Sequence, residues 1–226
     1  MSGSADPSDP LGAVQWPSSQ PWPQHSPLKL GLMASGDGTN IEAVVQACRV
    51  GPLQAEPVLL VVNNEGCGAR RRAERLQVPC RVLDHRLHPS REDLDRALIQ
   101  AFRTAQVDLV VMAGWMRIVT PVLIDAFQDR LLNIHPSLLP SFRGVDAIGQ
   151  ALRAGVRLSG CTAHLVRPEV DAGPVLVQAA VPVLDDDDHD RLAARIRAQE
   201  HRVLPLAIAL AAARLARTAA PEADQG

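Results

Sequence analysis

The stretch LLNIHPSLLP, residues 131–140, is the most informative part of this sequence. It closes an apolar run, which is typical of the carboxyl end of a buried strand. Because side chains two apart on a strand share a face, Asn133 and His135 point the same way and Ile134 points to the opposite layer. Pro136 favours an extended backbone at His135. An amide and an imidazole held side by side there can stabilise negative charge on a carbonyl oxygen under attack, although a buried polar pair with satisfied hydrogen bonds fits the same pattern.

Outward from this stretch, short apolar runs alternate with helical patterns. The predicted strands cover 28–34, 57–62, 80–83, 108–113 and 131–135, and the predicted helices cover 39–50, 67–76, 91–104 and a short segment from Thr120-Pro121. Strands that alternate with helices indicate an α/β fold with a mostly parallel, twisted sheet and helices on both faces.

The last third has a different pattern. A helix is expected over 145–154, followed by strands at 161–166 and 175–183 that indicate an antiparallel or mixed addition to the sheet. A long amphipathic helix is expected over 188–217, where Pro205 should kink or break it.

The termini differ in composition from the rest of the chain. Residues 1–27 carry six prolines among Ser, Asp and Gln, which predicts a flexible tail. Trp16 and Trp22 stand out in it and could cover an apolar patch or bind a partner. We expect one globular domain over 28–217 and a frayed tail over 218–226.

Composition excludes several classes of protein. With 226 residues, 46% of them hydrophobic, the chain can bury a real core, and its formal net charge of −2 argues against a nucleic-acid binder. The spacing of the four cysteines matches no zinc or redox motif, so we expect reduced thiols, no metal and a cytoplasmic protein. No apolar stretch is long enough to span a membrane, and no secretion signal is recognised.

A glycine loop follows the first predicted strand, with the sequence SGDGTN at residues 35–40. Thr39 or Asn40 can cap the next helix, whose free N–H groups would suit a phosphate. The loop is neither a P-loop nor a dinucleotide fingerprint, and an ordinary turn between a strand and a helix fits it equally well.

Two further segments are ambiguous when taken alone. In MAGWMRI, residues 112–118, Met116 and Ile118 are more typical of a core than of a binding site. Asp171 lies in a turn between two apolar strands, where it either serves the turn or returns to His135, stabilises the imidazolium and raises its pKa. His164 fits a buried, satisfied histidine as well as a supporting role in the site.

Together these residues resemble the phosphoribosylglycinamide formyltransferases, folate-dependent enzymes of purine synthesis. The landmarks are SGDGTN at 35–40, AGWMRI at 113–118, NIHPSLLP at 133–140 and DAGP at 171–174, in that order. The resemblance covers about residues 28–211 and implies a Rossmann-like formyltransferase fold. It also implies transfer of the formyl group of 10-formyltetrahydrofolate, as co-substrate, to the amine of 5-phosphoribosylglycinamide, by a monomer or homodimer.

The resemblance assigns roles to residues. It implies a catalytic set of Asn133, His135 and Asp171, a phosphate site of Gly38, Thr39 and Asn40, and a glycinamide contact at Glu200. The folate-binding residues that it implies are Arg91, Met116, Arg117, Ile118, Val119, Arg167, Pro168, Glu169 and Val170.

This chain departs from the family pattern at several positions. Ala172 replaces a common glycine and Asp37 replaces a common Asn or Ser, and the stretch FRGVDA at 142–147 differs from some members. Three alternatives are open. A methionyl-tRNA formyltransferase normally has a C-terminal RNA-binding domain, and a formyltetrahydrofolate deformylase normally has a second histidine where this chain has Pro136. A non-catalytic folate or nucleotide binder would not need the catalytic set.

Overall fold

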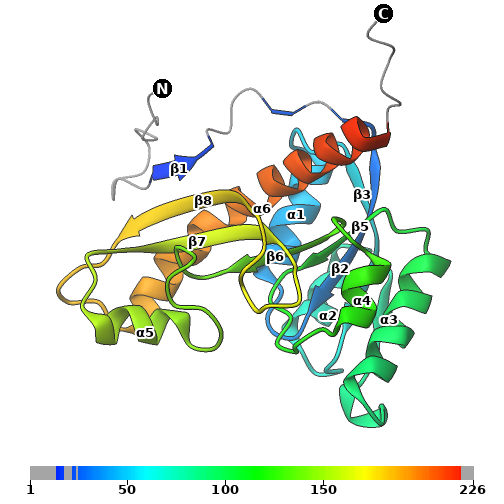
Figure 1. Ribbon diagram of the computed structural model, residues 1–226, viewed down its shortest axis with the longest axis horizontal. Helices are drawn as coiled ribbons and strands as arrows, with labels where there is room; N and C mark the ends of the chain where they lie inside the picture. The colour runs from blue at the N-terminus through cyan, green and yellow to red at the C-terminus, as the bar shows by residue number, and fades with distance from the viewer. Residues whose placement is uncertain (1–13, 18–21, 24, 220–226) are drawn as a thin grey trace, which may run out of the picture.

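The computed structural model of the chain describes residues 14–17, 22–23 and 25–219. Among these residues, one sheet has the strand order β1-β8-β7-β6-β5-β2-β3-β4 (Figure 1). The strands are β1 (Val14–Trp16), β2 (Leu28–Ala34), β3 (Ala55–Val62), β4 (Cys80–Val82), β5 (Leu109–Met112), β6 (Leu131–His135), β7 (Leu158–Leu165) and β8 (Val175–Pro182).

The sheet has a parallel part and an antiparallel part. Neighbours in the row β4-β3-β2-β5-β6 pair in parallel, whereas β7 pairs antiparallel with both β6 and β8. The predicted α/β class, the mostly parallel sheet and the antiparallel addition are therefore confirmed. β6 lies at the junction between the two parts, so Asn133 and His135 at its carboxyl end lie beside both the parallel and the antiparallel strands.

Helices cover both faces of the sheet. They are α1 (Thr39–Arg49), α2 (Gly68–Arg75), α3 (Arg91–Thr104), α4 (Pro121–Ala126), α5 (Ala147–Ala154) and α6 (His189–Ala219), with a short 3-10 helix at His85–Leu87. Buried residues of α1, α2 and α6 share one apolar cluster, whereas those of α3 and α4 belong to a second. The sheet therefore separates two cores.

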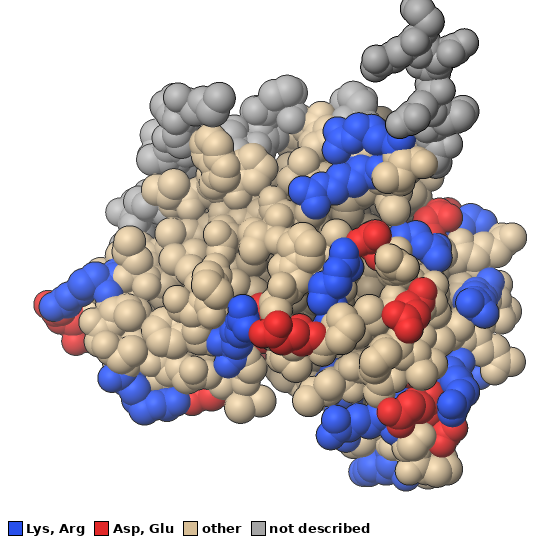
Figure 2. Space-filling view, viewed as in Figure 1, with Lys and Arg blue, Asp and Glu red and all other residues tan. Residues whose placement is uncertain are grey.

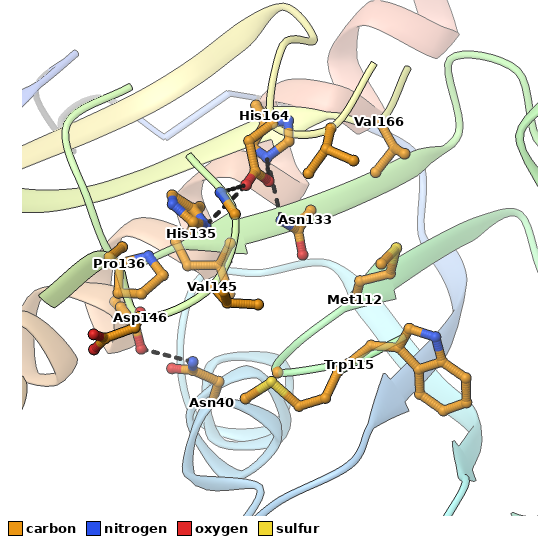
Figure 3. A pocket seen from close by; sticks show the side chains of 18 of the residues that line it. Asn40, Met112, Trp115, Asn133, His135, Pro136, Val145, Asp146, His164 and Val166 are labelled. Carbon is orange, nitrogen blue, oxygen red and sulfur yellow. Dashed lines mark hydrogen bonds and ion pairs between the residues drawn. The ribbon is translucent and has the colours of Figure 1, made fainter. Parts of the chain in front are cut away.

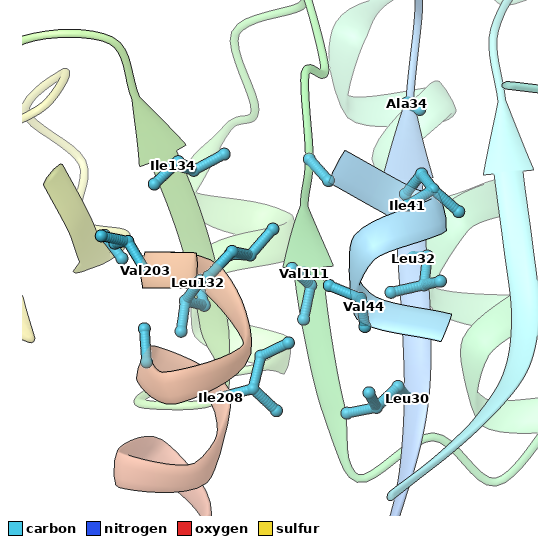
Figure 4. Packing of buried hydrophobic residues seen from close by; sticks show 14 of the residues in the cluster. Leu30, Leu32, Ala34, Ile41, Val44, Val111, Leu132, Ile134, Val203 and Ile208 are labelled. Carbon is cyan, nitrogen blue, oxygen red and sulfur yellow. The ribbon is translucent and has the colours of Figure 1, made fainter. Parts of the chain in front are cut away.

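The alternation of side chains along the strands creates these two cores. On β2, Leu30 and Leu32 pack in the first cluster and Met33 packs in the second. Figure 4 shows the first cluster, where Ile41 of α1 and Ile208 of α6 lie over the side chains of β2, β5 and β6. Burial on both faces explains why the parallel strands are almost continuously apolar in sequence.

The surface carries both signs of charge. Figure 2 shows basic and acidic side chains interspersed over the face in view, without a continuous field of one sign. Within the described part of the chain, no helix is both long enough and apolar enough to cross a membrane.

The N-terminal region differs from its prediction at residues 14–16. They form β1, which pairs antiparallel with β8 through Val14–Ala180 and Trp16–Gln178. The physical reason is that β8 would otherwise present an unpaired edge of backbone N–H and C=O groups. Trp22 is partly buried and packs against the first core cluster, in agreement with the prediction that it covers an apolar patch. Residues 1–13, 18–21, 24 and 220–226 lie outside the described residues.

Pro205 does not break the last helix, so the predicted break is wrong, and a kink at this position stays a prediction. α6 is continuous from His189 to Ala219 with Pro205 inside it. The buried side chains of Val203, Leu204 and Leu206 anchor both sides of the proline in the first core cluster. Tertiary packing of an apolar helix face therefore outweighs the hydrogen bond that proline removes.

Candidate active site

A cavity of about 560 Å³ lies at the carboxyl ends of β5 and β6 (Figure 3). Parallel α/β sheets commonly bind ligands at this edge, and the volume lies within the range for small-molecule sites. Its walls include Met112 and Asn133 from these strands, Asn40 from α1 and Glu200 from α6. Four elements distant in sequence therefore converge on one space.

Asn133, His135, His164 and Asp171 form one polar cluster in this cavity. His135 Nδ1 lies 3.3 Å from one Asp171 carboxylate oxygen, and His164 Nε2 lies 3.5 Å from the other. Asn133 Nδ2 lies 3.2 Å from His164 Nε2 (Figure 3). The cluster forms because β6 and β7 pair with Asn133 opposite His164, and the turn after β7 returns Asp171 to the same place. The three residues of the predicted catalytic set thus meet.

Both ring nitrogens of His135 face hydrogen-bond acceptors. Nε2 lies 2.8 Å from the carbonyl oxygen of Phe142, and Nδ1 faces Asp171. A carbonyl and a carboxylate only accept hydrogen bonds, so satisfying both requires a proton on each nitrogen. The His135 side chain is 7% exposed, which protects this arrangement from water. The geometry places both ring nitrogens of His135 opposite acceptors.

The surroundings of Asp171 stabilise its charged form. Burial alone would raise the pKa of Asp171, but hydrogen bonds from His164 and the Gly144 N–H, with the charge of His135, lower it below its ordinary value. The Gly144 N–H donates to Asp171 Oδ2 at 2.8 Å. Asp171 is therefore an anion at neutral pH and faces two imidazoles.

The glycine loop leads into α1 with a backbone that requires glycine. Gly38 has φ +78, and a Cβ there would lie 2.6 Å from Ala69 Cα in α2. Gly38 is the N-cap residue of α1 without a side-chain cap, so the predicted cap at Thr39 or Asn40 is wrong. Asn40 lies inside the first turn of α1, past the cap position, and its Nδ2 donates to Glu200 Oε2 at 2.9 Å. The N–H groups at the start of α1 are therefore left for an anion.

Glu200 is buried where α6 faces α1. Burial raises its pKa, and this effect exceeds the opposing hydrogen bond from Asn40 and the charge of Arg197. Asn40 Oδ1 is buried and has no partner among the described residues. A ligand that brings hydroxyl or amine donors would satisfy polar atoms here that the protein leaves unpaired.

The loop after β5 exposes apolar side chains on the cavity wall. Met116 is 76% exposed and Ile118 is 56% exposed, so their interpretation as core residues is wrong. Arg117, Val119, Arg167, Pro168 and Val170 also line the cavity. Apolar side chains exposed together in a concave wall indicate a ligand surface.

Four other predicted residues do not line the cavity. Gly38 and Thr39 lie immediately before Asn40 in the glycine loop, and Arg91 begins α3. Glu169 instead pairs with Arg143 at 2.6 Å.

Several known proteins are similar to this chain in sequence or in structure. A sequence profile described as Formyl transferase matches residues 28–208. The phosphoribosylglycinamide formyltransferase of Bacillus subtilis is 35% identical over 80% of this chain and 92% of its own length. The chain belongs to the formyl transferase family. The crystal structure of glycinamide ribonucleotide transformylase 1 from Symbiobacterium toebii matches with a TM-score of 0.79 and 42% identity, over 80% of this chain and 85% of that one.

Longer members of the formyl transferase family are also similar. The trifunctional purine biosynthetic protein adenosine-3 of Gallus gallus is 42% identical over 84% of this chain. The chain spans only 19% of the length of that relative. The similarity therefore concerns one segment of the trifunctional protein.

Sequence reasoning missed part of this formyl transferase site. His189, Ala193, Ile196 and Arg197 line the cavity together with Glu200. Along 189, 193, 197 and 200 each step is three or four positions, and Ile196 lies three positions after Ala193, so these residues share one face of α6. Helical periodicity extended backward from Glu200 would have found them. Asp146, which also lines the cavity and lies 3.7 Å from His189, had no recognisable signal.

The site contains no recognisable metal centre. Within the described ranges, no three His, Cys, Asp or Glu side chains are placed to hold a metal ion together.

Proposed function

We propose that this chain transfers the formyl group of 10-formyltetrahydrofolate to the amine of 5-phosphoribosylglycinamide. The observation that carries the proposal is the cluster of Asn133, His135 and Asp171 inside the cavity. Relatives that match most of the chain are named for this activity.

In the proposed reaction, the substrate amine attacks the formyl carbon. A bond forms between the amine nitrogen and that carbon, and the carbonyl oxygen becomes an oxyanion. Asn133 and protonated His135 donate hydrogen bonds to this oxygen. The bond from the carbon to folate N10 then breaks, and the proton lost by the amine reaches N10, with a water as the carrier. The products are formylglycinamide ribonucleotide and tetrahydrofolate.

The donors for this step are partly in place. The Asn133 amide lies 3.2 Å from His164 Nε2 and has two N–H groups, one of which can face the substrate oxygen. His135 Nε2 donates to the Phe142 carbonyl at 2.8 Å, so in the proposed reaction this hydrogen bond exchanges for one to the oxyanion. Asp171 holds the imidazolium through Nδ1 during that exchange. We assign His164 a supporting role, because it contacts both Asn133 and Asp171.

The substrates fit different parts of the same cavity. We place the phosphate at the glycine loop, where Gly38, Thr39 and Asn40 begin α1, and the glycinamide portion near Glu200. We place the folate against Met116, Arg117, Ile118, Val119, Arg167, Pro168 and Val170, which combine apolar surface with cations suited to its carboxylates. Arg91 and Glu169 do not line the cavity, so we propose that they contact the folate only outside it.

An absorbance assay for tetrahydrofolate production tests this function. The proposal predicts turnover of 10-formyltetrahydrofolate only when the ribonucleotide is present. Turnover without ribonucleotide would indicate a deformylase, and binding without turnover would indicate a non-catalytic binder. The cytoplasmic location and the oligomeric state stay predictions from sequence.

A further inference from the structure

Ser35 joins two loops of the site by hydrogen bonds from both its backbone and its side chain. The Ser35 N–H donates to the carbonyl of Gly114 at 3.0 Å. The Met116 N–H donates to Ser35 Oγ at 2.9 Å. Ser35 begins the glycine loop, residues 35–40, and Met116 belongs to residues 114–119, which we call the cavity loop. The two loops are therefore hydrogen-bonded to each other beyond the carboxyl ends of their strands.

The connection continues the pairing of the central strands. β2 and β5 pair in parallel up to Met33 and Met112, and the Ala113 N–H donates to the Met33 carbonyl at 2.9 Å. The bonds of Ser35 lie directly beyond this point, at the carboxyl ends of both strands. Ser35 therefore holds the first residues of the two loops together.

Each loop is also attached to an element on its far side. Ala69 of α2 donates its N–H to the Gly36 carbonyl at 3.0 Å. At the end of the cavity loop, the Thr120 N–H and hydroxyl both donate to buried Asp95 Oδ2, at 2.7 and 2.8 Å. The outer end of each loop is therefore fixed, and the hydrogen bonds of Ser35 join the inner end of the glycine loop to the inner end of the cavity loop.

We propose that Ser35 couples the two substrate sites, so that phosphate occupancy of the glycine loop raises the affinity of the cavity loop for folate, and the reverse. This inference rests on the proposed function, which places the phosphate and the folate on these two loops. Ser35 is a positioning residue in this account, since it acts through the backbone of Gly114 and Met116.

The physical basis of the coupling is the conformational entropy that the two loops lose when a ligand binds. An anion bound at the N–H groups that begin α1 restricts the glycine loop, and the bonds of Ser35 then restrict the cavity loop before folate arrives. The second ligand has less conformational entropy to remove, so it binds more tightly, and the coupling must be equal in both directions. The net contribution of one neutral hydrogen bond corresponds to about 2- to 10-fold in affinity.

A binding cycle with tetrahydrofolate and glycinamide ribonucleotide tests the coupling. No reaction occurs, because neither ligand carries a formyl group. Isothermal titration gives the folate Kd with and without saturating ribonucleotide. For the unmodified protein we expect ribonucleotide to tighten folate binding by about 2- to 10-fold. In Ser35→Ala this ratio should fall toward one, whereas Ser35→Thr, which keeps the hydroxyl, should restore it. Ser26→Ala, which removes an exposed hydroxyl before β2, is the matched control.

Hydrogen exchange gives a readout that a merely structural role would not change. Ribonucleotide alone should protect the Met116 amide in the unmodified protein and not in Ser35→Ala. Equal coupling ratios in the two proteins, or a ratio of one in the unmodified protein while both ligands bind, would overturn the inference alone. Failure of the unmodified protein to bind ribonucleotide would instead overturn the proposed function and the inference with it.

Discussion

The carboxylate of Asp171 lies 3.3 Å from Nδ1 of His135, although His135 ends β6 and Asp171 lies in the loop between β7 and β8. Asp171 is anionic at neutral pH because hydrogen bonds and positive charge outweigh its burial. The opposite ring nitrogen of His135 is directed at a carbonyl oxygen. This contact orients the imidazole that, in the proposed reaction, donates to the developing oxyanion.

Removing the charge of Asp171 should slow the chemical step more than substrate binding. We expect Asp171→Asn to lower kcat by about 10²-fold, the lower end for loss of one oxyanion-stabilising interaction. The reason is that a neutral amide no longer favours the imidazolium. Steady-state kinetics with both substrates measure this, and Asp125→Asn, on the exposed surface of α4, is the control. An unchanged kcat in Asp171→Asn would remove Asp171 from the mechanism.

Gly38→Ala should weaken binding of the ribonucleotide. The added methyl would collide with Ala69 and would force φ +78 on a residue that disfavours it. We expect KM for the ribonucleotide to rise at least tenfold, with a smaller change in KM for folate. Gly36→Ala is a sharp control, because a Cβ at Gly36 meets nothing within 4 Å. Equal effects of the two variants would argue against the proposed phosphate site.

Met116 should contribute to folate binding and little to stability. Met116 is 76% exposed, whereas Met33 is fully buried in the second core cluster. Met116→Ala should raise KM for folate severalfold without changing Tm. Met33→Ala should lower the free energy of unfolding by about 2–5 kcal/mol, as is usual for truncation in a core. If Met116→Ala lost stability and kept its KM for folate, Met116 would be structural.

Ionisation of Glu200 should lower the free energy of unfolding as the pH rises. Its pKa is raised in the folded state, so folding favours the protonated acid. The stabilisation is complete below the unfolded pKa, about 4.5, and is lost as the pH rises through the folded pKa. Glu200→Gln should therefore increase the free energy of unfolding at pH 8 by on the order of 1–3 kcal/mol, with a smaller gain at pH 4.

Denaturant unfolding of both proteins at the two pH values measures this difference. The same substitution should raise KM for the ribonucleotide, because the site loses its carboxylate. A gain in stability that was equal at both pH values would show that ionisation of Glu200 is not its cause.

The alternation of apolar strands and helices predicted most of the fold, because burial on both faces of a parallel sheet leaves a direct signal in sequence. β1 was not predictable, since Val14–Trp16 gains its partner only from the distant edge of β8. The continuity of α6 past Pro205 likewise depends on packing against the sheet. Local sequence does not encode either relationship.

The candidate site was predictable where motifs carry the chemistry. Asn133 and His135 follow from strand periodicity, and the return of Asp171 was a hypothesis that the geometry supports. The exposure of Met116 and the cavity face of α6 depend on tertiary arrangement. The acceptor that the Phe142 carbonyl offers to His135 is a backbone group, and the identity of the residue gives no signal for it.

The central claim is that His135 stabilises negative charge on the formyl oxygen, and the kcat of His135→Ala at saturating concentrations of both substrates tests it most directly. We predict a fall of about 10²- to 10³-fold in kcat, with the Kd for glycinamide ribonucleotide unchanged within a factor of about two. A His135→Ala protein that binds both substrates and turns over at the rate of the unmodified protein would contradict the account.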